Sequence, residues 1–160
     1  MMELYHGTNV VIDEIDLSCS RRGKDFGCGF YLNPDRRQAM EMAIRTTQRM
    51  MNGEPIVNAY LFDENMLKED SPLIVKVFDG YTKEWAEFIL ENRKNISDTP
   101  VHNYDIVVGP IADDTVGLQM RRFEQGYISI DRMIEELRFH KPATQFFFGT
   151  ERAIKCLRKI

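Results

Sequence analysis

The stretch Lys24-Asp25-Phe26-Gly27-Cys28-Gly29-Phe30-Tyr31-Leu32 decides the fold, because irregular chain gives way there to regular structure. Residues 9–26 are polar and rich in turn-forming residues, whereas Gly29 to Leu32 join a glycine to aromatic and apolar side chains. This change predicts a short strand over 29–32. A glycine at a strand edge also lets a ligand approach the backbone, and a neighbouring aromatic ring offers it a flat surface.

A long helix is expected directly after this strand. Asn33 is a favoured N-cap and Pro34 a favoured first helical residue, since proline lacks the amide hydrogen that would be unpaired there. Small and apolar residues then recur every three or four positions, which predicts one buried stripe. The members of this stripe are Ala39, Met40, Ala43, Ile44, Thr47 and Met51. We interpret the stripe as core packing and Gly53 as the end of the helix.

Strands and helices are expected to alternate irregularly along the rest of the chain. Further strands are predicted over 2–5, 55–62, 73–78, 105–111 and 145–148, and further helices from Thr82, Thr115, Ser129 or Asp131, and Thr150. The last helix is expected to bury Ala153, Ile154 and Leu157 on one face. No regular β-α-β period is present, so the pattern favours α+β over a doubly wound parallel sheet.

The overall composition narrows the class of function. The 160 residues include 21 Lys and Arg against 25 Asp and Glu, a net charge of −4, and 43% are hydrophobic. These values are typical of a globular protein, and they argue against a general nucleic-acid binder, which needs a positive footprint. The overall charge does not exclude a local basic patch on the long helix. Its members would be Arg36, Arg37, Arg45 and Arg49.

The cysteines and apolar runs point to no metal, disulfide or membrane segment. Cys19, Cys28 and Cys156 are odd in number and far apart, without zinc-ligand spacing. No apolar run approaches the roughly 18 residues that span a bilayer. The N-terminus lacks the basic segment and apolar core of a signal peptide. We therefore expect a cytoplasmic protein without a membrane partner.

Two short motifs stand out, since the common phosphate-binding, metalloprotease and esterase motifs are missing. The first is Leu4-Tyr5-His6-Gly7-Thr8, and the second is Gly27-Cys28-Gly29-Phe30-Tyr31-Leu32. Each has an ordinary structural interpretation when taken alone. A histidine beside a turn is usually structural, and two glycines before an aromatic residue often mark a tight entry into a strand.

The order of these motifs resembles the ADP-ribosyltransferase superfamily, on the histidine–tyrosine branch that includes poly-ADP-ribose polymerases and diphtheria-type toxins. His6-Gly7-Thr8 is similar to its first motif and Gly27-x-Gly29-Phe30-Tyr31 to its second, and Gln145 stands where its third begins. More closely, the chain resembles a bacterial family of domains of unknown function placed in that superfamily. The supporting stretches are 24–32, 85–93, 104–114 and 145–157.

The resemblance implies one domain over 1–160, built as an α+β split sandwich of two small antiparallel sheets, with NAD as co-substrate. His6 would hydrogen-bond the adenosine ribose. The Gly7 backbone would pair with the nicotinamide amide, Thr8 would support that loop, and Tyr31 would pack on the nicotinamide ring. The full set expected to bind NAD is His6, Gly7, Thr8, Arg21, Gly29, Phe30 and Tyr31.

Arg21 belongs to this set because of its charge and position. With Arg22 and Lys24 it forms a basic loop before the second motif, which suits the pyrophosphate of NAD. A solvated basic loop is the alternative interpretation.

The implied reaction is the loss of nicotinamide through an oxocarbenium-like state and transfer of ADP-ribose to a protein or nucleic-acid acceptor. His6, Tyr31 and Gln145 form the expected catalytic triad. Small domains of this kind are similar to toxin components of bacterial conflict systems, so a neutralising partner protein is also expected. Two other functions stay open. One is a non-catalytic module that binds NAD, ADP-ribose or a partner, and the other is an NAD glycohydrolase.

Two positions depart from the pattern of the superfamily. Enzymes that transfer ADP-ribose usually carry a glutamate where this chain has Gln145, and an amide cannot offset a developing positive charge. A lost contact of this type costs roughly 2.7–4 kcal/mol, or about a hundred- to thousandfold in rate. Glu151 and Glu124 are candidate replacement carboxylates. Met40 and Met42 occupy the helix that often supplies a second aromatic ring, which predicts a softer nicotinamide sandwich.

Other conspicuous residues have structural interpretations. Asp113 and Asp114 precede Thr115 and suit a helix N-terminus better than a metal or acid–base pair. Trp85 lies at helical spacing with Phe88 and Ile89, which favours core packing over ligand stacking.

Overall fold

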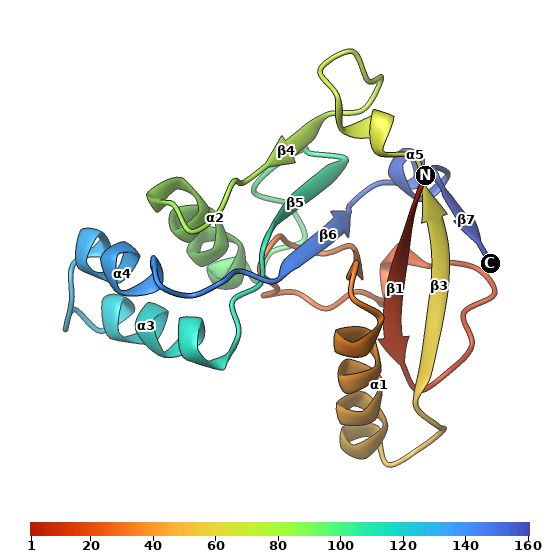
Figure 1. The fold of residues 1–160 in the computed structure, drawn as a ribbon, viewed down its shortest axis with the longest axis horizontal. Helices are drawn as coiled ribbons and strands as arrows, with labels where there is room; N and C mark the ends of the chain where they lie inside the picture. The colour runs from red at the N-terminus through yellow and green to blue at the C-terminus, as the bar shows by residue number, and fades with distance from the viewer.

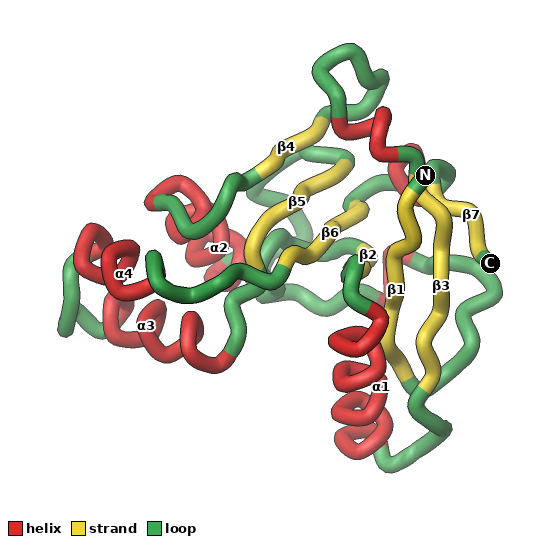
Figure 2. The backbone as a smooth tube through the Cα atoms, in the orientation of Figure 1, coloured by secondary structure: helices red, strands yellow, loops and turns green.

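Seven strands form two sheets in the computed structural model, which describes residues 1–160 (Figures 1 and 2). The strands are β1 (Met2–Thr8), β2 (Phe30–Leu32), β3 (Ile56–Phe62), β4 (Val75–Val77), β5 (Ile106–Pro110), β6 (Thr144–Phe148) and β7 (Leu157–Lys159). The helices are α1 (Arg36–Met50), α2 (Lys83–Lys94), α3 (Asp114–Glu124), α4 (Ile130–Leu137) and α5 (Glu151–Ile154), with 3-10 turns η1 (Leu17–Cys19) and η2 (Glu64–Leu67). The expected α+β class is confirmed.

The first sheet has the order β1-β3-β7 and is antiparallel, and the second has the order β2-β6-β5-β4. Both sheets are mostly antiparallel, as expected, and the one parallel pair is at the edge of the second sheet, where β4 lies beside β5. Parallel neighbours need a long crossover, and α2 provides it between these two strands.

A single bridge connects the two sheets. Tyr5 and Asn33 exchange both backbone hydrogen bonds, with N···O distances of 2.9 and 2.8 Å. Beyond this bridge β1 and β2 do not pair, because β1 continues beside β3 while β2 belongs to the second sheet. The split between β1 and β2 is where the two sequence motifs meet.

The helix after the second motif begins later than the sequence suggested. Asp35 is its N-cap and accepts from the Arg37 amide, so neither Asn33 as the cap nor Pro34 as the first helical residue is correct. Asn33 is held in the bridge to Tyr5, and its side chain accepts from the Asp35 amide, which delays the first turn.

The predicted buried stripe of α1 is also mostly wrong. Only Ala39 and Ala43 are buried, whereas Ile44 is 41% exposed and Met51 is 91% exposed. The reason is close packing on β1, since a Cβ on Gly7 would lie 1.7 Å from the Ala39 carbonyl oxygen. A helix this close to a strand makes contact only through its small residues.

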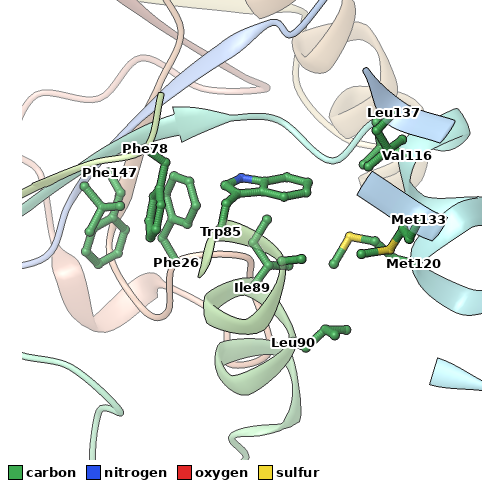
Figure 3. Packing of buried hydrophobic residues seen from close by; sticks show 12 residues of the cluster. Phe26, Phe78, Trp85, Ile89, Leu90, Val116, Met120, Met133, Leu137 and Phe147 are labelled. Carbon is green, nitrogen blue, oxygen red and sulfur yellow. The ribbon is translucent and has the colours of Figure 1, made fainter. Parts of the chain in front are cut away.

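Two hydrophobic clusters occupy the two faces of the second sheet, because successive side chains of a strand point to opposite faces. Phe146 and Phe148 of β6 pack between the sheets with Leu4 and Phe62 of the first sheet. Phe147 points to the other face, where it packs with Phe26 in the cluster that α2 joins, and α3 and α4 extend this cluster beyond α2 (Figures 1 and 3). Trp85 is fully buried there, which confirms its expected core role, and its indole N–H donates to the Pro110 carbonyl at 3.1 Å.

The chain end differs from the expected helix. α5 is a single turn from Glu151 to Ile154, and Leu157 lies instead in β7, opposite Phe62 of β3. Leu157 still packs against the cluster between the sheets, so its apolar character was a correct signal but the element was not. No helix is long and apolar enough to cross a bilayer.

Candidate functional site

His6 lies on β1 at the split and reaches across to β2. Its Nδ1 is 2.7 Å from the Tyr31 carbonyl oxygen, and its ring stacks on Phe30 with a centroid separation of 4.5 Å. A carbonyl only accepts, so Nδ1 carries the proton and Nε2 of the neutral ring is an acceptor. Burial lowers the pKa of His6, and the charge of Lys24 lowers it further, which favours this neutral form.

A cavity of about 320 Å³ opens beside His6. Thr8 of β1 and Gly29, Phe30 and Tyr31 of the second motif also line it. The structure therefore brings five of the seven residues expected to bind NAD to one cavity. The volume is within the usual range for small-molecule sites.

Gly7 does not line this cavity, but its backbone faces the split. The N–H and C=O of neighbouring strand residues point to opposite edges, so those of Gly7 point to the same edge as those of Tyr5. Tyr5 uses its groups to bind Asn33, whereas β2 does not pair with Gly7. Gly7 is buried, and β2 leaves its N–H and C=O without a strand partner at the split. The absence of its side chain has a structural cause in the packing of α1.

Tyr31 braces the glycine loop of the second motif. Its hydroxyl donates to the Gly27 carbonyl at 2.7 Å and accepts from the Phe26 amide at 3.0 Å. The ring meets Phe147 edge-on, at 5.3 Å between centroids. Burial raises the pKa of Tyr31 above its ordinary value, so the hydroxyl stays a neutral donor. The sequence did not reveal this bracing role.

Lys24 is the basic residue of the loop that enters the cavity. Its Nζ lies 4.9 Å from the centroid of the Tyr31 ring, and it forms no salt bridge. Burial lowers the pKa of Lys24, and the charge of Arg21 lowers it further. The other two basic residues are placed elsewhere. Arg21 does not line this cavity, and Arg22 pairs with Asp98 and donates to the Ile96 carbonyl.

Gln145 lies on β6 and does not line the cavity with His6. Its Nε2 is 3.4 Å from both Asp25 Oδ2 and the Pro110 carbonyl oxygen. Asp25 Oδ1 in turn accepts from Arg93 Nε at 2.7 Å. The Asp25 and Arg93 side chains are 18% and 29% exposed, so the pair is only partly covered.

Asp25 is therefore the carboxylate that the structure places beside Gln145. The two candidates from sequence lie elsewhere: Glu151 opens α5 behind its Thr150 cap, and Glu124 is exposed at the end of α3. Sequence reasoning missed Asp25, although it lies in the decisive stretch. Its pairing with Arg93 of α2 depends on tertiary packing, which no local pattern reports.

The remaining predicted residues have ordinary roles. Asp113 caps α3 by accepting from the Val116 amide at 2.9 Å, as expected. Met40 and Met42 of α1 do not line the cavity.

A family with the description "Protein of unknown function (DUF3990)" matches residues 2–159 of the chain. No curated protein and no solved structure gives a significant match.

Proposed function

Because the chain belongs to the DUF3990 family, whose description assigns no activity, we propose a function from the site itself. The protein binds NAD at the split between β1 and β2 and transfers ADP-ribose to an acceptor, in the manner of histidine–tyrosine ADP-ribosyltransferases. The carrying observation is the 2.7 Å contact of His6 Nδ1 with the Tyr31 carbonyl, which joins the two motifs at the edge of a cavity.

Three groups at the split fit the parts of NAD. The Nε2 acceptor of His6 suits a ribose hydroxyl, which is a donor. The N–H and C=O of Gly7, which have no partner on β2, match the acceptor and donor of a carboxamide. Lys24 is a partly buried cation without a carboxylate partner, so it suits the pyrophosphate. Glu14 and Asp16 also line the cavity and offer acceptors to further hydroxyls.

Bound NAD supplies ADP-ribose when its bond between ribose and nicotinamide breaks and the electron pair leaves with nicotinamide. The chain's task is to orient this bond and to stabilise positive charge on the ribose. Gln145 has no charge to offer, whereas Asp25 does. Asp25 follows Lys24 in the chain but does not itself line the cavity of His6; we assign it the electrostatic role, with its carboxylate positioned by Gln145 and Arg93. Arg93 offsets part of the charge of Asp25, which predicts slow turnover.

The test is incubation of the purified protein with NAD, with and without cell lysate, while nicotinamide release is measured. If ADP-ribose from labelled NAD becomes attached to lysate components only when the protein is present, transfer is supported. NAD affinity is measured in parallel by calorimetry on His6→Ala and on His140→Ala, an exposed histidine outside the site. We expect His6→Ala to weaken NAD binding at least tenfold and His140→Ala to leave it unchanged. Equal affinity of both variants would show that the site is misplaced.

A non-catalytic NAD- or ADP-ribose-binding module is the second candidate function. The ion pair between Asp25 and Arg93 favours it, since a paired carboxylate has less charge to offer a reacting ribose. NAD binding without nicotinamide release under either condition would select this function. Release that needs no lysate would instead select an NAD glycohydrolase.

A further inference from the structure

A second and larger cavity, of about 600 Å³, lies on the other side of the glycine loop of the second motif. Gly27 and Cys28 line it, whereas the next residue, Gly29, lines the cavity of His6. Its remaining walls come from the C-terminal half of α2 and from the loop over 95–104, together with the end of β6. Nothing in the proposed NAD site uses these walls.

One wall holds a largely buried asparagine whose side-chain oxygen has no protein partner and is accessible from the cavity. Asn92 is 3% exposed, and its Nδ2 donates to the Phe88 carbonyl at 2.8 Å, which fixes the amide orientation. No hydrogen bond of the structure reaches its Oδ1. That oxygen lies 3.0 Å from the position that a Cβ on Gly27 would take, so the glycine leaves the space before it free. Because the rest of the side chain is held in place while Oδ1 is accessible from the cavity, this oxygen is a candidate contact for a ligand donor.

A second wall is aromatic and uncharged. His102 Nε2 donates to the Phe26 carbonyl at 2.7 Å, and its Nδ1 accepts from the Tyr104 amide at 3.1 Å. Both ring nitrogens are thus satisfied in the neutral form, and the ring acts as a flat surface. Tyr104 lies 5.3 Å from it between centroids and has a hydroxyl without any hydrogen bond.

The charges at the rim cancel. Arg22 pairs with Asp98 and also donates to the Ile96 carbonyl, which ties the glycine loop to the loop over 95–104. No other Lys, Arg, Asp or Glu lines the cavity. A phosphate chain would therefore find no free cation here, whereas an uncharged ring would meet no unfavourable charge.

From these features we propose that the second cavity binds a nucleobase that carries an amino group, as a free nucleoside. The amino group donates to Asn92 Oδ1, the ring lies against the wall formed by His102 and Tyr104, and the Tyr104 hydroxyl serves a second polar atom. The volume exceeds that of one base and accommodates the sugar as well. This site goes beyond the proposed NAD site and does not depend on it.

The test measures nucleoside binding to the intact protein without NAD, by calorimetry or saturation-transfer NMR. The decisive pair is adenosine and purine riboside, which lacks only the amino group. A site that pairs its acceptor with this group rejects the analogue. We expect adenosine to bind at least tenfold more tightly. Guanosine and cytidine show which aminated base is preferred. Equal binding of adenosine and purine riboside, or no binding of any of the three aminated nucleosides at millimolar concentration, overturns the proposal.

Variants separate this cavity from the NAD site. Asn92→Leu and Tyr104→Leu are expected to lose adenosine binding at least tenfold, and Asn65→Ala, at an exposed asparagine on η2, is the control. If circular dichroism shows that Asn92→Leu does not fold, Tyr104→Leu and the comparison of adenosine with purine riboside still test the proposal. Adenosine is also a part of NAD, so its binding is measured in His6→Ala as well, where the binding that depends on Asn92 and Tyr104 is expected to remain. Loss of binding in His6→Ala but not in Tyr104→Leu would place adenosine in the first cavity and overturn the proposal. Tighter binding of a single-stranded oligonucleotide than of adenosine would also overturn it, in favour of a nucleic-acid strand.

Discussion

His6 of β1 and Tyr31 of β2 are joined side chain to backbone, by a 2.7 Å contact from imidazole Nδ1 to carbonyl oxygen at the point where the two strands stop pairing. The imidazole takes the place of a ladder hydrogen bond. As a result the strands stay connected, while the Gly7 backbone has no partner on β2 and His6 Nε2 has no hydrogen bond.

Stability is expected to fall on mild acidification because two histidines are held neutral. Burial lowers the pKa of His6 and of His102 below the ordinary value of 6.5. The unfolded chain therefore takes up protons near pH 6.5, while the folded chain takes them up only at lower pH. The stabilising contribution is fully present above this pH and is lost as the pH falls below it.

Urea unfolding between pH 7.5 and 5 checks this expectation. The free energy of unfolding should decrease as the pH falls, by up to about 1.4 kcal/mol for each unit of pKa lowering. A flat profile in this pH range would contradict the neutral state of both buried rings.

Gly7→Ala is expected to disrupt the packing of α1 on β1. The added Cβ would lie 1.7 Å from the Ala39 carbonyl oxygen, so the helix must shift. We expect a loss of roughly 1–3 kcal/mol or more in the free energy of unfolding. Gly117→Ala in α3 is the matched control, because its nearest neighbour is a flexible Arg121 atom at 3.7 Å. It should stabilise the protein by about 0.5–1 kcal/mol. Similar effects of both substitutions in urea unfolding would refute the steric argument.

Most elements of this fold were predictable from local patterns. The caps at Thr82, Ser129 and Thr150 formed as expected, and Gly126 adopts the positive φ of 79° suited to a helix end. These signals act over a few residues, so tertiary packing seldom overrides them.

The errors arose where partners distant in sequence decide the outcome. The helix α1, which follows the second motif, starts late because Asn33 is bonded to Tyr5. Most of its predicted apolar stripe is not buried, because Gly7 lets the helix approach β1 closely. By contrast, three residues that line the first cavity were predictable, because Gly29, Phe30 and Tyr31 are adjacent in the second motif. The link between Asp25 and Arg93 spans 68 positions and has no local signature.

Lys24→Met is expected to weaken binding of NAD and of ADP-ribose to the same extent. The lysine is the cation of the first cavity, and a charge-assisted contact to the pyrophosphate is common to both ligands. Loss of such a bond corresponds to roughly tenfold to a hundredfold in affinity. Calorimetry on both ligands checks this, with exposed Lys68→Met as the control. Unchanged affinity for ADP-ribose would remove Lys24 from the phosphate site.

Tyr31→Phe is expected to loosen the glycine loop without removing the ring. The hydroxyl donates to the Gly27 carbonyl and accepts from the Phe26 amide, so its loss leaves two backbone groups without a partner. The free energy of unfolding should fall by about 1–3 kcal/mol. Tyr127→Phe, at a tyrosine that is 75% exposed, should change it by less than about 0.5 kcal/mol. If the two variants are equally stable in urea, the hydroxyl does not brace the loop.

Gln145→Glu is expected to harm the site, although it introduces the glutamate that ADP-ribosyltransferases usually carry in their third motif. The amide Nε2 faces Asp25 Oδ2 and the Pro110 carbonyl at 3.4 Å, and a carboxylate there would set two negative groups side by side. We expect a loss of roughly 1–3 kcal/mol in the free energy of unfolding at pH 7 and no gain in nicotinamide release. Asp25→Asn should lower release about a hundredfold or more, while NAD affinity changes little. Faster release by Gln145→Glu, together with full activity of Asp25→Asn, would return the electrostatic role from Asp25 to position 145.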